Sequence, residues 1–467
     1  MMTNSANPAD RLLAQADQLR QALPGDFRDT LVQALYHEAE SMAQKTVQQG
    51  GRKRWDWDST VDRLLTSPIF GLPLMLAILS LIFWLTIAGA NVPSAMLAEG
   101  FFWVEAQGVA LFTSLGIPWW ITGFLWDGVF RGLGWVISVM LPPMAIFFPL
   151  FTFLEDLGYL PRVAFNMDWL FKKAGAHGKQ SLTMAMGFGC NAAGIIATRV
   201  IDSPRERLIA ILTNNFVPCN GRFPTLIMLA TVFVAASFPP ALTSVIAAGS
   251  VVTVVVIGII FTLVISGVLS RTVLRGEASA FSLELPPFRR PNLRQIFYTS
   301  LIDRTIFVLW RAIQTAAPAG AAIWLLANIY VGDTSLAWHI ANALRPLGNA
   351  VGLDGVILLA YIIAIPANEI VVPTMMMMYL GAGMMTDMPA YSEMHTMLVG
   401  QYGWTTLTAI NLMLFSLLHN PCATTIMTMW KETRSLKWTT LGALGPLVIA
   451  FAVTFLVAVV ARAFGLG

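Results

Sequence analysis

Charged side chains are scarce in this sequence of 467 residues: they make up 12% of it, whereas hydrophobic residues make up 56%. A soluble domain of this length needs a wetted surface and therefore more charge. Hydrophobic runs of about 20 residues, the length that crosses a bilayer, recur from Ile69 onward, for example at Ala241–Ser270 and Trp404–Trp430. The sequence therefore predicts an all-α polytopic membrane protein.

Cysteines are few, and the common catalytic motifs are missing. The three cysteines lie in or beside hydrophobic segments, which argues against a disulfide framework. No Gly-x-x-x-x-Gly-Lys-Ser/Thr loop, Ser/His/Asp pattern or His-Glu-x-x-His helix occurs. We therefore expect no catalytic residue, no nucleotide-binding or hydrolytic site and no permanently bound cofactor. The net charge of +3 is spread over loops, so we also expect no nucleic-acid partner.

The first 66 residues are polar and contain no hydrophobic stretch typical of a signal peptide. Within them, Asp26–Val47 has the 3.6-residue period of an amphipathic helix that packs on a partner or on the cytoplasmic face. The basic cluster Arg52–Arg54 precedes the first membrane helix, Ile69–Ala90, so the positive-inside rule predicts a cytoplasmic N-terminus. The acidic, aromatic-rich stretch Asn91–Arg131 is predicted to be an interfacial element at the outer face.

Two later stretches follow one scheme in opposite predicted orientations: a full helix, a broken segment that re-enters the membrane, and a further helix. The first comprises Leu133–Leu154, Ser181–Thr198 and Leu208–Phe238, and the second comprises Ile306–Val331, Gly355–Leu380 and Trp404–Trp430. Each third element contains a Pro-Cys pair. Inverted repeats with broken helices are typical of secondary transporters. The alternative is that charge counting over short loops has produced a false symmetry.

These patterns predict six regions. They are a cytoplasmic helical region (1–66), the first membrane helix with the outer-face segment (67–132), the first repeat with a connecting helix (133–270), a cytoplasmic loop (271–305), the second repeat (306–438) and a last membrane helix (439–467). The predicted fold class is an all-α polytopic membrane protein with two inverted repeats and re-entrant broken helices.

The strongest local pattern is Met186–Asn191, where two glycines break a membrane segment directly before the thiol of Cys190 and the amide of Asn191. Backbone groups freed by such a break are tolerated only against protein or a watery cavity, so Cys190 is predicted to border one. Thiolate sulfur binds late and borderline divalent metals. The alternative is that cysteine serves here only as a small hydrophobic residue.

Glu369 lies between hydrophobic runs, where a carboxylate is costly, and is therefore a candidate functional residue. Its neighbour Asn368 offers a carbonyl oxygen. Together with Asn191 and the three cysteines, these residues would form a mixed oxygen and sulfur site that suits ferrous iron, with manganese, cobalt or zinc as competitors. The predicted metal-site residues are thus Cys190, Asn191, Cys219, Asn368, Glu369 and Cys422. The alternative for Glu369 is a structural ion pair with Arg311 or Arg222.

Three other features have competing interpretations. His419 lies one turn before Cys422 and either joins the site or satisfies a hydrogen bond. Met375–Met378 offers four thioethers, but consecutive helical residues point in different directions, so packing is the better interpretation. Glu155 and Asp156 end the second membrane helix, where they either receive exiting cations or are solvated.

Motifs along most of the chain resemble those of the FeoB-type ferrous iron transporters. They are Asp62–Leu65, Gly71–Pro73, Leu154–Tyr159 with Arg162, Gly187–Asn191, Thr198–Arg199, Pro204–Arg207, Cys219 with Arg222, Arg275–Glu277, Glu284–Pro286, Asn368–Val372 and Pro421–Cys422. All three cysteines fall on cysteine positions of that family. The sequence departs from the family pattern beside the cysteines, with Ala192-Ala193 where a proline is usual, and at Asn368, where a lysine is common.

The resemblance implies a gate-type transporter fold, import of ferrous iron across the bacterial inner membrane and an ion path lined by the cysteines. It also implies a small GTPase domain and a helical linker before the membrane part; this sequence lacks the GTPase, and Asp26–Val47 resembles the last linker helix. We therefore expect a separate GTPase at the N-terminal region or transport uncoupled from GTP, and a homo-oligomer is compatible with the pattern.

The function predicted from the sequence is a ferrous iron permease with the lipid bilayer and the metal ion as partners. Two alternatives keep the fold but change the cargo, to another divalent metal or to an organic solute such as a nucleoside. A third is a membrane scaffold that does not transport and that docks a soluble partner through residues 1–66.

Overall fold

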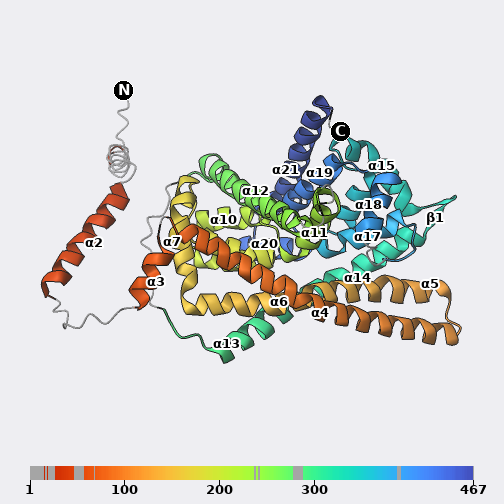
Figure 1. Ribbon diagram of the computed structural model, residues 1–467, viewed down its shortest axis with the longest axis horizontal. Helices are drawn as coiled ribbons and strands as arrows, with labels where there is room; N and C mark the ends of the chain where they lie inside the picture. Colours follow the sequence, from red (N-terminus) through yellow and green to blue (C-terminus); the bar gives the residue numbers. More distant parts are fainter. Residues whose placement is uncertain are drawn as a thin grey trace, which may run out of the picture.

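The computed structural model describes residues 27–46, 57–67, 69–235, 238–239, 242–276, 288–385 and 391–465, together with residues 15 and 18. These parts are almost entirely helical (Figure 1). The one sheet in the described residues is a hairpin of β1 (Tyr330–Val331) and antiparallel β2 (Thr334–Ser335). The predicted all-α fold class is confirmed. The basic cluster Arg52–Arg54 lies outside the described residues.

Two separate helices lie in the described ranges 27–46 and 57–67 of the N-terminal region. Helix α2 (Phe27–Thr46) lies away from the helical body and agrees with the helix predicted there (Figure 1). Its hydrophobic side chains, including Leu35 and Met42, are exposed. Helix α3 (Trp57–Leu65) is held to the body because Arg162 donates to both carboxylate oxygens of Asp62, at 2.8 and 3.2 Å.

The first membrane helix is much longer than predicted. Helix α4 (Gly71–Ser114) runs unbroken for 44 residues, so the prediction that it ends near Ala90 is wrong. Pro93 lies inside it, because a proline removes only one backbone donor and membrane helices tolerate that loss. At about 1.5 Å per residue, such a helix is roughly 66 Å long, about twice the bilayer core.

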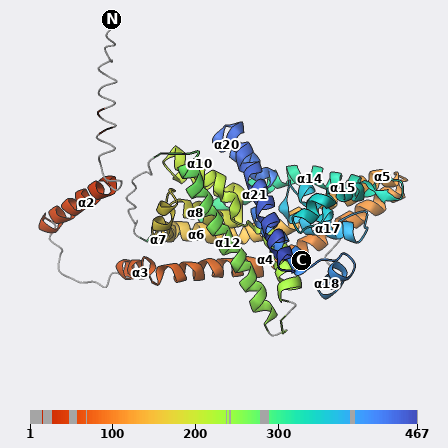
Figure 2. The ribbon, with the colours of Figure 1, turned by 90° about the horizontal axis from the view of Figure 1, so that it is seen from above.

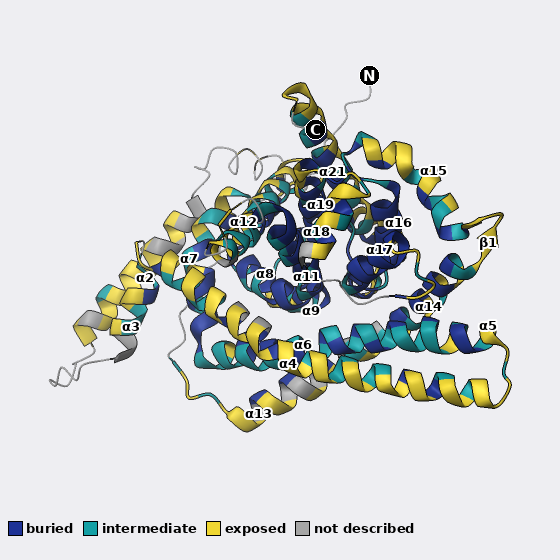
Figure 3. Cartoon of the chain, turned by 45° about the vertical axis from the view of Figure 1, so that its right-hand side comes forward, coloured by how far each residue is buried: buried dark blue, intermediate teal, exposed yellow. Residues whose placement is uncertain are grey.

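The chain returns beside α4 through α5 (Trp119–Thr122), the π-helix η1 (Gly123–Phe130) and α6 (Arg131–Leu157). The segment Asn91–Arg131, predicted as an interfacial element, is therefore the far end of a helical hairpin that projects from the body (Figure 3). An ion pair between Arg131 and Glu105, 2.9 Å apart, joins the two arms. This pairing allows Glu105 to be buried near the C-terminal end of a hydrophobic helix.

The first repeat follows the predicted order of helix, broken segment and further helix. After α6 come α7 (Tyr159–Lys173), the broken pair α8 (Gln180–Gly189) and α9 (Asn191–Ala197), and the 3-10 helix η2 (Thr198–Val200). Then follow α10 (Pro204–Thr213), η3 (Asn214–Phe216), η4 (Asn220–Arg222), α11 (Phe223–Leu229), the π-helix η5 (Ala230–Val234) and the connecting helix α12 (Thr243–Arg271).

The second repeat has a comparable order. Before it come α13 (Leu293–Phe297) and η7 (Tyr298–Ile306). The repeat itself contains α14 (Phe307–Asn328), α15 (Leu336–Ala350), α16 (Gly355–Ile363), η8 (Asn368–Ile370), α17 (Val371–Tyr379) and α18 (Tyr391–Gly400). It ends with α19 (Thr406–Leu418) and α20 (Ala423–Thr433), and α21 (Leu436–Ala463) closes the chain. The loop predicted over 271–305 is wrong in its last part, because 293–306 is helical and Ser300 there bonds Thr152 of α6 at 2.9 Å.

The third element of each repeat was predicted as one further helix, over Leu208–Phe238 and Trp404–Trp430. Each of these elements is broken in the middle. The chain leaves helical geometry at Val217–Cys219 and again at His419–Cys422. Proline explains both breaks, because Pro218 and Pro421 lack a backbone donor and disfavour the helical conformation of the residue before them. Each repeat therefore contributes two broken elements to the centre of the molecule rather than one.

Five helical stretches in the described residues are long and apolar enough to cross a membrane, or six if the bent pair α15–α16 is counted as one span. They are Gly71–Ser114, Trp119–Leu157, Pro204–Val234, Val245–Arg271 and Leu436–Ala463. Helices α12 and α21 cross the middle of the helical body in the view of Figure 2. A stripe of hydrophobic residues on α12, including Val252, Val256 and Ile260, is exposed, as expected of a face in contact with lipid.

Candidate functional site

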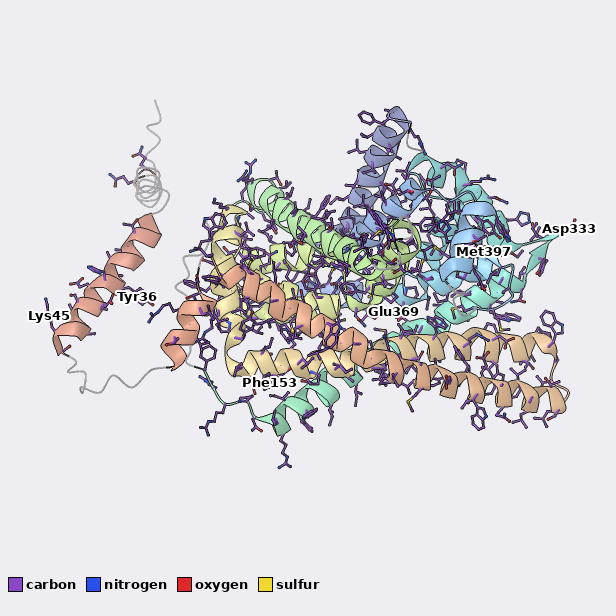
Figure 4. The ribbon with its side chains drawn as sticks, in the orientation of Figure 1. Tyr36, Lys45, Phe153, Asp333, Glu369 and Met397 are labelled. Carbon is purple, nitrogen blue, oxygen red and sulfur yellow. The ribbon has the colours of Figure 1, made fainter. Side chains whose placement is uncertain are left out.

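All six predicted site residues line one small cavity where the broken elements of the two repeats meet. The cavity has a volume of about 30 Å³ and is bordered by Cys190, Asn191, Cys219, Asn368, Glu369 and Cys422, together with Met140, Met144, Gly189, Gly221, Pro366, Ala367, Thr424 and Thr425. Figure 4 shows Glu369 in the middle of the helical body. A volume of this size is about the share of one water molecule in the liquid, so it fits a single ion.

The first broken segment presents Cys190 and Asn191 at its tip. Cys190 is extended, with φ −154° and ψ 123°, between the end of α8 and the start of α9. Gly189 is required before it, because a Cβ there would lie 2.3 Å from the ring of Phe147 on α6. In the orientation that satisfies its neighbours, the Asn191 amide nitrogen donates to the carbonyls of Gly187 and Val217.

The second broken segment presents Asn368 and Glu369 from η8. The carboxylate packs directly on the backbone of Gly221, where a Cβ would lie 2.2 Å from Glu369 Oε1. Among the described residues, Glu369 forms no ion pair, and Arg222 does not bind it. The structural pairing of Glu369 with Arg222 is therefore wrong, and the side chain of Arg311 lies outside the described residues.

Arg222 instead joins the two Pro-Cys breaks. Its guanidinium is 1% exposed and donates to the carbonyl oxygens of Asn215 and Leu417 at 2.8 and 2.7 Å. It also donates to Asn215 Oδ1 at 3.0 Å and to the His419 carbonyl at 3.2 Å. These carbonyls end half-helices of opposite repeats, and a cation is the favourable partner for a helix C-terminus.

His419 supports the site without lining the cavity. Its Nε2 lies 3.3 Å from Asn368 Oδ1, and its Nδ1 lies 2.9 Å from the carbonyl oxygen of Ser416. The interpretation that His419 satisfies a hydrogen bond is the one that this geometry supports. Through this contact His419 fixes the direction of the Asn368 side chain.

The structure adds two sulfur-containing side chains to the cavity that the sequence analysis missed. Met140 and Met144 of α6 border the cavity, and their spacing of four residues, which places them on one helix face, was the available signal. The Met375–Met378 run, which lies on α17, does not border it: all four side chains are buried. Thr424 and Thr425 add hydroxyl groups, and Thr425 Oγ1 lies 3.2 Å from Cys422 Sγ.

The cavity is not a closed coordination shell. Among the residues that the structure describes, no three His, Cys, Asp or Glu side chains lie close enough together to hold a metal ion. The three cysteines are all free thiols, so no disulfide blocks them. Side chains that border a common space without enclosing it would suit an ion that must bind and leave, as conduction requires. Metal binding by the six residues stays a prediction.

In this helical membrane protein, broken helices of two repeats meet at a polar cavity. This arrangement defines the class of gate-type transporters. A family model described as "Gate: Nucleoside recognition" matches 137–233 and 309–436, which are the two repeats. A second, described as "Ferrous iron transport protein B C terminus", matches 251–303. These two matches make the chain similar to the membrane portion of the FeoB-type ferrous iron transporters.

Curated relatives agree with this assignment. The chain is 29% identical over 403 residues to the Fe(2+) transporter FeoB of Synechocystis sp., covering 85% of this chain and 62% of the relative. It is 29% identical over 437 residues to that of Staphylococcus aureus, covering 90% and 61%. A protein of Porphyromonas gingivalis named as a fusion of Fe(2+) transport protein A and FeoB is 25% identical over 442 residues, covering 85% and 51%. No solved structure matches significantly.

Proposed function

We propose that this chain forms the ion pathway of a ferrous iron permease. The observation that carries the proposal is the convergence of three thiols, a carboxylate and two amides from four separate broken elements on one cavity. The relatives named as Fe(2+) transporters support the choice of cargo, although the chain spans only about three fifths of the length of the first two.

The chemistry of the cavity favours a borderline divalent metal over other ions. Thiol sulfur is a poor ligand for sodium, potassium or magnesium and a good one for iron, cobalt or zinc. Glu369 would offset part of the ion's charge, and the amide oxygen of Asn368 would replace part of its water shell. The breaks at Cys190 and at Pro366 free backbone groups that would otherwise be locked in helices, which is what a gated path in a membrane requires.

The size of the cavity argues against an organic cargo at this position. A pocket for a drug-sized organic molecule measures about 300–1,000 Å³, whereas the cavity between the cysteines measures about 30 Å³. A nucleoside would need a separation of the two repeats that an ion does not need. The cavity volume therefore favours a metal ion.

The same proposal includes the surroundings of the protein. The chain lies in the bacterial inner membrane with its N-terminus in the cytoplasm, and residues 1–66 contact a separate GTPase. The exposed hydrophobic side chains of α2 support such a contact, since a partner would cover them. Co-purification of a GTPase with the full chain, and its loss when α2 is removed, would test this part.

The test of the proposal is ferrous iron uptake into anaerobic proteoliposomes that contain the full chain. We expect uptake by the wild type, and loss of uptake in Cys190→Ser and Glu369→Gln. Met376→Leu is the matched control, because it removes a fully buried sulfur that does not border the cavity and should leave uptake unchanged. Iron uptake that both site variants retain, or uptake of a labelled nucleoside instead of iron, would overturn the proposal.

A further inference from the structure

A second and much larger cavity lies in line with the first. It has a volume of about 1060 Å³, and four helices, α6, α8, α9 and α20, border both cavities. On α20, Thr424 borders the small cavity and Thr428 the large one; on α8, Gly189 borders the small cavity and Met186 the large one. Steps of three to four residues correspond to about 5–6 Å along a helix, so about one helical turn separates the two spaces.

The mouth of the large cavity is charged. Arg199, Lys431 and Arg434 border it, together with the carboxylates Glu155 and Glu432. Lys179 and Asp202 form a further ion pair, 2.9 Å apart, in the loops on either side of the broken segment α8–α9. Lysine and arginine concentrate in the cytoplasmic loops of membrane proteins, so this mouth faces the cytoplasm.

An ion pair connects the two repeats at this mouth. Arg199 Nε donates to Glu432 Oε2 at 3.0 Å, and Arg199 Nη2 donates to Oε1 at 2.6 Å, which is the bidentate geometry of a strong guanidinium–carboxylate contact. Arg199 follows α9 of the first repeat directly, whereas Glu432 lies in the last turn of α20 of the second.

The two connected helices form part of the wall between the cavities. Helix α9 packs against α20, and Ile195 and Met429 are buried between them in one small cluster with Ile211. Separation of α9 and α20 would open a path from the small cavity to the large one, because both helices border both spaces. The Arg199–Glu432 pair opposes that movement at its outer end.

The Arg199–Glu432 ion pair is weak enough to break and form again. The Arg199 side chain is 66% exposed, whereas that of Glu432 is 12% exposed. Solvent and salt weaken an ion pair at such a site, so it biases a conformation without locking it. When the pair separates, the Glu432 carboxylate becomes free to face a cation that leaves the cavity.

We propose that the large cavity is the cytoplasmic exit vestibule of the ion path and that the Arg199–Glu432 pair holds it closed toward the thiol-lined cavity. This inference rests on the proposed function, since it gives the path a direction and a closure. It also assigns roles to two residues that lie outside the candidate metal site.

Thiol labelling tests the inference without any metal. Membrane vesicles that expose the cytoplasmic face, and vesicles of the opposite orientation, are treated with a membrane-impermeant, positively charged methanethiosulfonate reagent. The modification of Cys219 and Cys422 is then followed by peptide mass spectrometry. We expect slow labelling of the wild type and a rate roughly two- to fivefold higher from the cytoplasmic face in Arg199→Ala and Glu432→Gln, the range for an exposed ion pair.

Two further variants make the result specific. The charge exchange Arg199→Glu with Glu432→Arg should return the rate to that of the wild type. Lys179→Ala removes the Lys179–Asp202 pair, which lies within the first repeat, and should leave the rate unchanged. Equal rates in all variants, or faster labelling only from the opposite face, would overturn the inference. Iron uptake measured in parallel separates the two proposals. The labelling rates test the closure of the vestibule and do not depend on the cargo, whereas the uptake tests whether the cargo is iron.

Discussion

Cys190 and Ala367 have the same extended backbone conformation, with φ and ψ of −154° and 123° in one and −152° and 117° in the other. Each stands at the tip of a broken segment, and each is followed by an asparagine. Cys219 and Cys422 correspond in the same way, at −80° and 169° and at −64° and 160°. The two repeats thus place matching backbones around the cavity, but only the first repeat carries a thiol at the tip.

This correspondence predicts that a thiol can be moved between the repeats. Cys190→Ala should lower iron uptake, and adding Ala367→Cys to that variant should restore most of it, because Ala367 borders the same cavity with the same backbone geometry. Ala364→Cys is the control, since Ala364 is buried nearby but does not border the cavity. Rescue by both cysteines, or by neither, would show that the repeat relation has no bearing on ion binding.

A second prediction concerns the contact between Gly221 and Glu369. In Gly221→Ala the new Cβ would lie 2.2 Å from Glu369 Oε1, so the carboxylate must turn away while the fold adapts at little cost. We expect the apparent KM for iron to rise roughly tenfold, about 1.4 kcal/mol, with little change in Tm. Gly249→Ala is the control because no atom lies within 4 Å of its Cβ position. An unchanged KM would place Glu369 outside the ion path.

Arg222 and Arg199 provide a matched pair for stability. Arg222→Ala leaves buried carbonyls of both repeats without a donor, at about 1–3 kcal/mol for each group left unpaired, so we expect a large fall in Tm or no folded protein. Arg199→Ala removes an exposed contact worth less than about 1 kcal/mol, so its Tm in detergent should hardly change. Similar Tm values for the two variants would contradict the structural role given to Arg222.

The sequence predicted several hydrophobic spans and two of the four central helix breaks. Hydrophobic runs indicated α12 and α21 to within a few residues, since length and composition decide whether a segment spans a bilayer. The breaks in Ser181–Thr198 and Gly355–Leu380 were visible because glycine and proline act locally on the backbone. The six site residues were grouped by the chemistry of their side chains, and the structure places all of them on one cavity.

The features that the sequence did not predict depend on distant partners. Helix α4 was expected to end near Ala90 because the stretch Asn91–Arg131 is acidic and rich in aromatic residues, whereas Glu105 pairs with Arg131 on the returning arm. Arg199 and Glu432 are separated by 233 positions in the sequence, and nothing local pairs them. The helix break at each Pro-Cys pair was missed because the surrounding residues are hydrophobic enough to read as one span.

The last prediction concerns pH and the turn between α7 and α8, outside the membrane-spanning segments. Burial lowers the pKa of His177 below its ordinary value of 6.5, and the nearby Glu206 carboxylate raises it back only in part. Its Nδ1 accepts the backbone N–H of Lys179 at 3.0 Å, a bond that protonation of Nδ1 would remove. The unfolded chain therefore binds the proton more readily, and stability falls as the pH drops below about 6.5.

We expect His177→Asn to reduce this dependence, because the asparagine carbonyl oxygen can accept the same bond and does not titrate. The measurement is the Tm of the purified chain in detergent between about pH 5 and pH 8, where an ordinary histidine changes charge. The wild type should lose more stability than the variant on the acidic side, and the two curves should run parallel on the alkaline side. If the curves also run parallel below pH 6.5, the acid sensitivity of the fold arises elsewhere than at His177.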